Sequence, residues 1–545
     1  MSTTVRTPCD EAVIRSGAAE SPCSKAAAPW VLAATIIGSS ITFIDGTVVN
    51  VALPVLQRDL GTNIGGAQWI VEAYSLMLSA LILVGGSLGD RLGRKRIFSL
   101  GVILFAVASA FCGLSQSTIQ LIIFRALQGV GAAMLVPGSL AIISASFAKK
   151  DRGRAIGTWS GFTAISAGIG PVLGGWLIQN VSWRWIFFIN LPLAVVVLAI
   201  TWWHVPESRD ETAGKRLDVI GAATATLGLG GVVYGLVEAG GRGFADIRII
   251  ISLAGGAAML ALFVFIEGKR GPRAMMPLAL FRSRTFAGAN LLTFFLYGAL
   301  SGLMFFLPFN LIQVQGYSPT QAGAALLPFV LIMFILSRWA GGLVERYGAK
   351  LPLVMGPTIA SIGFALFIIP GAAAGGYWLS FFPAVIVMSL GMATSVAPLT
   401  TTVMGAIDER HAGIASGINN AVSRTAGLIS IAVFGVVMIG VFARSLEPKV
   451  QTLDVPAEVR AELTNQSSRL ATISIPDRIT GDSKSAVTQA IEESFVDGFR
   501  VVIVIGAGLA LLSGLFAWLF IEGKPRPKKR PAKARREAEK QAVGF

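Results

Sequence analysis

Fourteen stretches of apolar residues, each about long enough to cross a bilayer, follow one another along this 545-residue chain. A hydrocarbon core of about 30 Å needs roughly 20 apolar residues in a helix. A helix also satisfies its own backbone hydrogen bonds in lipid. Only 14% of the residues are charged, against about a quarter in soluble proteins. The sequence therefore predicts an all-α integral membrane protein with 14 transmembrane helices, at 30–53, 69–89, 97–114, 119–143, 155–179, 184–203, 219–238, 248–266, 285–312, 321–343, 351–370, 377–404, 412–442 and 499–521.

The distribution of Lys and Arg predicts the orientation of these helices. The short loops on one face carry nineteen Lys and Arg residues, and those on the other carry about four. Because cytoplasmic loops are enriched in cations, we expect a multi-pass protein of the bacterial inner (plasma) membrane with both termini cytoplasmic. The first 29 residues lack an apolar run with a cleavage site, so we expect no removable signal peptide.

Charge and metal-ligand content exclude several functions. The tail at 524–540 holds nine of the cations behind the +15 net charge. We expect it to contact anionic lipid and not nucleic acid. Three cysteines and two well-separated histidines predict neither a disulfide framework nor a metal site. No G-x-x-x-x-G-K-[ST] phosphate loop is present, so no ATP or other cofactor is expected.

An internal repeat predicts the architecture. GSLGDRLGRKR (86–96) aligns without gaps with GGLVERYGAKL (341–351) at an offset of 255, and DRGRAIG (151–157) resembles ERHAGIA (409–415) at an offset of 258. Both copies are expected on the cytoplasmic face, so the repeat is parallel, as in major facilitator transporters. We expect two parallel six-helix halves plus two inserted helices. The predicted parts are a cytoplasmic tail (1–29), an N-terminal half (30–203), a cytoplasmic loop with the inserted helices (204–266), a C-terminal half (267–521) with an external loop (443–498), and a basic cytoplasmic tail (522–545).

Several motifs make this resemblance specific. The chain resembles the fourteen-helix drug:proton antiporter family of the major facilitator superfamily from about Trp30 to Ile521, including an exporter motif in the fifth helix. The resemblance is carried by IDGTVVNVALP (44–54), GSLGDRLGRKR (86–96), RALQGVGAA (125–133), GIGPVLGG (168–175), WRWIFFINLP (183–192) and QVQGYSPTQAG (313–323).

Asp45 is the first candidate for proton coupling. It lies about two-thirds of the way along its helix from the predicted cytoplasmic end, and ionisable groups at such depth usually serve transport. Arg125, in the outer half of the fourth helix, is its expected counter-charge. The resemblance implies that Arg125 takes part in proton transfer. The structural alternatives are an Asp45 that only shapes its helix and an Arg125 that snorkels to the interface.

The loop motif is a candidate conformational latch. The resemblance implies that Asp90 and Arg91 make charged contacts with the other half when the cytoplasmic side closes, which is a bistable arrangement. A purely topological role would explain the cations but not Asp90 or Gly93. The candidate latch residues are Gly86, Asp90, Arg91, Gly93, Arg94, Lys95, Glu345 and Arg346.

The fifth helix contains GFTAISAGIGPVLGGWL (161–177), with five glycines and a proline. Small residues let membrane helices approach closely. Gly161, Gly168 and Gly175 share one face, and Gly170 and Gly174 form a second strip; Pro171 favours a kink. We expect close packing between the halves, with ordinary packing as the alternative. The resemblance implies an exporter role for Gly168, Gly170, Pro171, Gly174 and Gly175.

The substrate site is less constrained by the sequence. Aromatic and amide side chains would suit a cavity for lipophilic cations, although most aromatics are expected to face lipid or the core. Glu72 and Glu238 lie near predicted outer helix ends, so we expect them to be solvated. The candidate cavity residues are Asn50, Gln128, Phe294, Tyr297, Asn310 and Asn419.

Together these features predict a proton-coupled efflux transporter that exports lipophilic, cationic drugs or antibiotics by alternating access. The expected partners are the substrate, protons and membrane lipid, with the monomer as the functional unit. The sequence does not address a periplasmic adaptor. One alternative is a dedicated exporter of a metabolite, a self-made antibiotic or a lipid. A non-transporting sensor and a membrane enzyme are remote alternatives, and we expect no enzyme activity.

Overall fold

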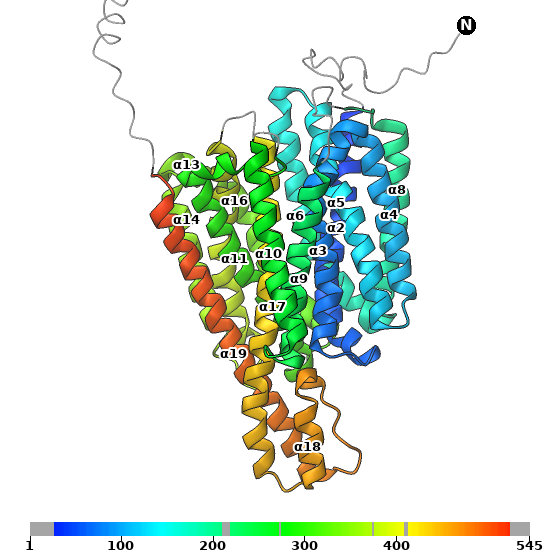
Figure 1. The fold of residues 1–545 in the computed structure, drawn as a ribbon, viewed down its shortest axis with the longest axis vertical. Coiled ribbons are helices and arrows are strands. Elements are labelled where there is room, and N and C mark those ends of the chain that lie inside the picture. The colour runs from blue at the N-terminus through cyan, green and yellow to red at the C-terminus, as the bar shows by residue number, and fades with distance from the viewer. Residues whose placement is uncertain (1–26, 210–217, 272–273, 373–374, 408–411, 524–545) are drawn as a thin grey trace, which may run out of the picture.

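A computed structural model describes residues 27–209, 218–271, 274–372, 375–407 and 412–523. The predicted terminal tails and the start of the 409–415 copy therefore lie largely outside the described residues. The first group of helices forms one side of the bundle in Figure 1. It comprises α2 (Ala28–Asp59), α3 (Ile64–Leu92), α4 (Arg94–Leu114), α5 (Thr118–Ser146), α6 (Lys149–Asn180), α7 (Trp185–Phe188) and α8 (Asn190–His204).

The second group of helices forms the other side of the bundle, and two further helices come between the groups in sequence. These two are α9 (Val219–Arg242) and α10 (Ile247–Arg270). The second group comprises η2 (Leu278–Arg282), α11 (Arg284–Phe309), η3 (Asn310–Val314), α12 (Pro319–Ala324), α13 (Leu327–Tyr347), α14 (Lys350–Leu366), α15 (Tyr377–Ser380), α16 (Phe382–Gly405), α17 (Ala412–Thr452), α18 (Ala457–Asn465), η5 (Ser467–Thr472) and α19 (Gly481–Phe520).

The predicted membrane-spanning architecture is confirmed. Within the described residues, thirteen helical segments are long and apolar enough to cross a membrane, and the shorter apolar helix Lys350–Leu366 supplies the remaining predicted segment. All fourteen predicted stretches thus fall on helices. Breaks occur where α7 meets α8, where α11 passes into the π-helical turn η3, and where α12 meets α13.

The internal repeat is visible in the backbone. Helix α3 ends at Gly93 with φ 114°, and α13 ends at the equivalent Gly348 with φ 81°. In both, the glycine N–H donates to the carbonyl four residues earlier. Positive φ is accessible to glycine at little cost, so the two aligned glycines fulfil the same helix-ending requirement in each copy.

The segment assigned to the external loop (443–498) is mostly helical. Helix α17 continues to Thr452, and α19 starts at Gly481, well before its apolar part. With α18 they form a projection beyond one end of the bundle (Figure 1). Val450, Val459, Leu463 and Val487 are buried in the projection and belong to the same apolar core as the membrane helices. Its polar composition hid this amphipathic packing. We call this end of the molecule the α18 end.

Helix α9 packs against both groups. It contacts α3 of the first group and α17 of the second, whereas α10 packs mainly against α9. Only 11% of the most apolar window of α10 is buried within the protein. Helix α9 therefore forms part of the interior interface, and α10 presents an apolar surface to the outside, as expected for a lipid-facing helix.

Candidate functional site

The first candidate site is a buried polar cluster around Asp45 of α2. Arg125 Nη1 of α5 donates to Asp45 Oδ2 at 2.5 Å. Gln128 Nε2 donates to Asp45 Oδ1 at 2.8 Å, and Asn190 Nδ2 of α8 donates to the same oxygen at 3.3 Å. All four residues are at most 1% exposed. The two residues expected to pair, far apart in sequence, are thus brought together by three helices.

Arg125 also attaches this cluster to α3. Its Nε donates to the Ile70 carbonyl oxygen at 3.1 Å, and its guanidinium lies 4.3 Å from the centre of the Tyr74 ring. Nη1 donates to Gln128 Oε1 at 2.7 Å. A buried ion pair is tolerated when further hydrogen bonds satisfy its remaining polar atoms. One guanidinium therefore joins α5 to both α2 and α3.

The local sequence explains how the cluster forms. Arg125 and Gln128 are three residues apart, so both lie on one face of α5. Asn190 begins α8 immediately after the break at the end of α7, and its amide also donates to Ser109 Oγ at 3.0 Å. The sequence analysis missed Asn190. The available signal was a single amide in the apolar run WRWIFFINLP (183–192).

The expected cavity residues separate into different environments. Gln128 belongs to the Asp45 cluster and is fully buried, so it does not line an open cavity here. Asn310 is only 2% exposed and lies in η3. Asn419 Nδ2 of α17 donates to Asn290 Oδ1 and Thr293 Oγ1 of α11. These contacts place Gln128 and Asn419 in hydrogen-bond networks between helices.

Phe294 is the one expected cavity residue that lines a described apolar cavity, of about 160 Å³. Asn50 and Tyr297 are half-buried, and Asn50 Oδ1 has no hydrogen-bond partner among the described residues. The apolar cavity lies where α3, α9, α10, α11 and α17 meet. Its lining is Ser79, Ala80, Leu83, Ala225, Leu229, Phe263, Met275, Met276, Phe294, Ile418, Ala421, Val422 and Thr425.

The glycines of α6 lie on two different faces of the helix. On one face, added Cβ atoms at Gly168 and Gly175 would collide with Val330 of α13 and with the backbone at Pro319 of α12. On the other, Cβ atoms at Gly170 and Gly174 would meet Thr47 and Val48 of α2. The first face makes the expected close contact between the halves, and the second packs within the first group. Helix α6 continues through Pro171, whose carbonyl lies against Gly323.

The described contacts of the loop between α3 and α4 are with the first group and with the segment that follows α8. Arg94 Nε donates to Asp90 Oδ1 at 2.9 Å, and Gly86 lies against Pro137 of α5. Glu345 and Arg346 are exposed at the end of α13. The latch role of these residues, together with Arg91, Gly93 and Lys95, stays a prediction.

Glu207 is a second residue that the sequence analysis missed. Its carboxylate accepts hydrogen bonds from the backbone N–H groups of Lys95 and Arg96, at 3.0 and 3.2 Å, at the start of α4. A helix N-terminus favours negative charge. A Cβ at Gly93 would lie 2.6 Å from this carboxylate carbon, which, with the positive φ, requires glycine there. The available signal was a carboxylate shortly after the sixth helix, on the face with the basic loops.

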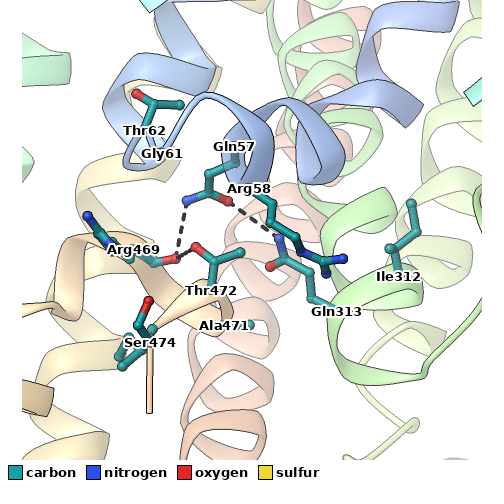
Figure 2. A pocket seen from close by; sticks show the side chains of 11 residues that line it. Gln57, Arg58, Gly61, Thr62, Ile312, Gln313, Arg469, Ala471, Thr472 and Ser474 are labelled. Carbon is teal, nitrogen blue, oxygen red and sulfur yellow. Dashed lines mark hydrogen bonds between the residues drawn. The ribbon is translucent and has the colours of Figure 1, made fainter. Parts of the chain in front are cut away.

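The α18 end holds a polar cavity of about 360 Å³, shown in Figure 2. Gln57 of α2 lies at its centre. Gln57 Nε2 donates to the Arg469 carbonyl oxygen of η5 at 3.2 Å, and Gln57 Oε1 accepts from Gln313 of η3 at 3.4 Å. This amide thus ties the two groups and the projection together. The lining is Gln57, Arg58, Gly61, Thr62, Ile312, Gln313, Arg469, Ala471, Thr472, Ile473 and Ser474.

The expectation that Glu72 is solvated is wrong. Its side chain is 0% exposed, and neither carboxylate oxygen has a hydrogen-bond partner among the described residues. Glu238 differs, since it is partly exposed and pairs with Arg242 at 3.2 Å. Glu72 was misplaced because α9 and α17 cover its face of α3, and a linear sequence does not reveal that cover.

A family model described as the Major Facilitator Superfamily matches residues 35–431. The chain belongs to this superfamily. Membership makes it a transporter and not an enzyme, and the helical architecture agrees. The superfamily's fold also appears in the crystal structure of a bacterial homologue of the human lysosomal transporter Spinster. That structure matches with a TM-score of 0.63 and 19% identity, covering 92% of this chain and 100% of the other.

Several proteins similar to this chain are named as resistance proteins. The multidrug resistance protein Stp of Mycobacterium tuberculosis is 33% identical over 500 residues, covering 89% of this chain and 91% of Stp. The tetracenomycin C resistance and export protein of Streptomyces glaucescens is 30% identical, covering 94% and 95% of the two chains. The puromycin resistance protein pur8 of Streptomyces alboniger is 29% identical, covering 91% and 92%.

Proposed function

We propose that this transporter exports lipophilic, cationic drugs or antibiotics in exchange for protons. The observation that carries the proposal is the Asp45 cluster, in which one buried carboxylate is held by Arg125, Gln128 and Asn190. The printed names of the relatives, with multidrug and antibiotic resistance among them, support a drug as the substrate.

Proton and substrate compete for Asp45 in this mechanism. A proton on Asp45 removes the negative charge that holds Arg125, since the guanidinium itself keeps its proton. The neutral carboxyl then releases α5 and α3, and the halves rearrange around the midplane. When the proton leaves, the carboxylate attracts either Arg125 or a cationic substrate. This competition couples proton entry to drug exit without any other cofactor.

The close contacts of α6 supply the other part of the mechanism. Gly168 lets the backbone of α6 contact a side chain of α13. Gly175 lets it contact the backbone of α12. Such contact excludes water, so it seals the α18 end while the opposite end opens. We place the α18 end outside the inner membrane and both termini in the cytoplasm, in line with the Lys and Arg distribution. The monomer contains the complete path.

The test uses inverted membrane vesicles with an imposed acid-inside pH gradient. A panel of cationic and neutral drugs is added, and collapse of the gradient is followed for the wild type and Asp45→Asn. We expect collapse with some cations in the wild type and none in the variant. Collapse that survives the substitution moves the proton to another group. Absence of any response in the wild type contradicts drug antiport and favours a dedicated metabolite exporter.

A further inference from the structure

A second carboxyl, Glu72, is buried on the opposite face of α3 from the Asp45 cluster. It lies eight residues after Ile64, the first residue of α3. Both of its oxygens are inaccessible and accept no hydrogen bond from any described residue. Burial of a carboxylate in an apolar site disfavours its charged form strongly unless a partner compensates.

The residues one turn away on the same face explain why no partner is available. Gln68 Nε2 is committed to the Ile431 carbonyl oxygen of α17, at 2.7 Å. Leu76 belongs to an apolar cluster with Val233 of α9 and Leu428 of α17. We call the contact between α3, α9 and α17 around Glu72 the Glu72 seam. It is an apolar interface between the two groups of helices and the inserted helix α9.

Charged groups on the neighbouring helices form no described hydrogen bond with Glu72. Asp45 of α2 and Arg125 of α5 pair with each other, as do Glu238 and Arg242 of α9. Arg424 of α17 interacts electrostatically with Tyr74. None of the described cations forms an ion pair or hydrogen bond with Glu72. The remaining charged groups on elements that pack against α3 are Arg58 and Asp59 of α2, Arg94, Lys95 and Arg96 of α4, Arg444, Glu447 and Lys449 of α17, and Arg469 of η5.

We propose that Glu72 is a second proton-binding group of the transport cycle, protonated in this conformation and deprotonated when the Glu72 seam opens. The inference deepens the proposed antiport and rests on it. It gives α9 a role, because a helix inserted between the halves forms one wall of the seam. A structural role would require Glu72 to make a contact that holds the helices, and no such contact is present among the described residues.

Helix α3 connects this carboxyl to Asp45. Arg125 contacts the Ile70 carbonyl and the Tyr74 ring, which lie two residues before and two residues after Glu72. Residues two apart project to nearly opposite sides of a helix. Arg125 therefore contacts the helical turn that carries Glu72 from the side opposite to the Glu72 side chain. Protonation of Asp45 releases Arg125, which frees this turn to shift against α9 and α17. Water then reaches Glu72 and accepts its proton.

Dicyclohexylcarbodiimide labelling of the purified full-length protein tests the protonation directly. This apolar reagent reacts with protonated carboxyl groups in apolar surroundings, and mass spectrometry locates the adduct. We expect labelling at Glu72, falling about tenfold per pH unit above its titration midpoint. Glu72→Gln should lose the adduct, whereas Glu238→Gln should keep it. Absence of label at Glu72 at every pH overturns the proposal, whether or not the protein transports drugs.

Ethidium transport in the inverted vesicles tests the coupling. Exchange of this monovalent cation for two protons moves net charge, whereas exchange for one does not. We expect uptake driven by membrane potential alone in the wild type and at least a fivefold loss of that uptake in Glu72→Gln, with pH-driven uptake retained. Equal potential-driven uptake in both proteins overturns the proposal. No pH-linked ethidium movement in the wild type contradicts the proposed function instead, and the labelling result then decides the protonation state of Glu72.

Discussion

Asp45 and Glu72 are both fully buried acids that face interfaces of α3, yet their surroundings are opposite. Asp45 accepts hydrogen bonds from three side chains, one of them a guanidinium. Glu72 accepts none from the described residues. A compensated carboxylate stays charged, and an uncompensated one favours its neutral form. Burial alone therefore does not determine the charge of an acidic side chain in a membrane protein. The hydrogen-bond donors around the side chain determine it.

Substitution of Arg125 should have the largest effect on the difference between the surroundings of Asp45 and Glu72. In Arg125→Leu, Asp45 becomes a second buried acid without its cation. Breaking one side of a buried ion pair costs about 3–5 kcal/mol, and we expect a large fall in the thermal midpoint in detergent together with loss of transport. The double variant Asp45→Asn/Arg125→Leu should recover part of the stability but not the transport. A single variant as stable as the wild type would contradict a compensated pair.

Gln128→Leu should weaken the same cluster while leaving its ion pair in place. The substitution removes one neutral donor to Asp45, and a hydrogen bond to a charged group contributes about 1.5–3 kcal/mol. We expect a moderate loss of stability and a moderate loss of proton-driven transport, because one donor that holds the Asp45 carboxylate is removed. Gln120→Leu, near the start of α5, is the control. Proton-driven transport equal to that of the wild type would remove Gln128 from the coupling mechanism.

The sequence predicted the Asp45–Arg125 pair but not the rest of this contrast. Depth in the membrane and matching positions in two helices were enough to pair opposite charges. Gln128 was assigned to a substrate cavity because an amide in an apolar helix serves either role, and only the crossing of α2, α5 and α8 decides. Asn190 was missed because its position depends on the break before α8.

The same limit applies to larger parts of the fold. The fourteen helices follow from local apolar length, and the repeat follows from aligned residues. The helical projection formed by α17, α18 and α19 does not, because its buried apolar residues come from three separated segments. The burial of Glu72 likewise depends on α9 and α17, which are more than a hundred residues away in sequence. Contacts that depend on tertiary packing cannot be predicted from a local sequence pattern.

Glu72→Leu should change stability in the opposite direction from Arg125→Leu. It removes a polar group that has no hydrogen-bond partner in an apolar seam, and an unsatisfied buried group costs about 1–3 kcal/mol. We expect a raised thermal midpoint in detergent, with potential-driven transport lost. Glu238→Leu, which removes a partly exposed acid from α9, should change stability little. A lowered midpoint for Glu72→Leu would indicate that Glu72 makes a stabilising contact.

Tyr74 offers the smallest and most specific test, because its ring contacts Arg125 from the helix that carries Glu72. Tyr74→Leu removes the aromatic face beneath the Arg125 guanidinium, and such contacts contribute about 0.5–2 kcal/mol. Tyr74→Phe keeps the ring and should behave as the wild type. If Arg125 holds the turn that carries Glu72, Tyr74→Leu should also increase carbodiimide labelling at Asp45 by loosening its pair, and should change the labelling at Glu72. Equal labelling of both sites in Tyr74→Leu and Tyr74→Phe would mean that the two carboxyls titrate independently, and that α3 does not connect them.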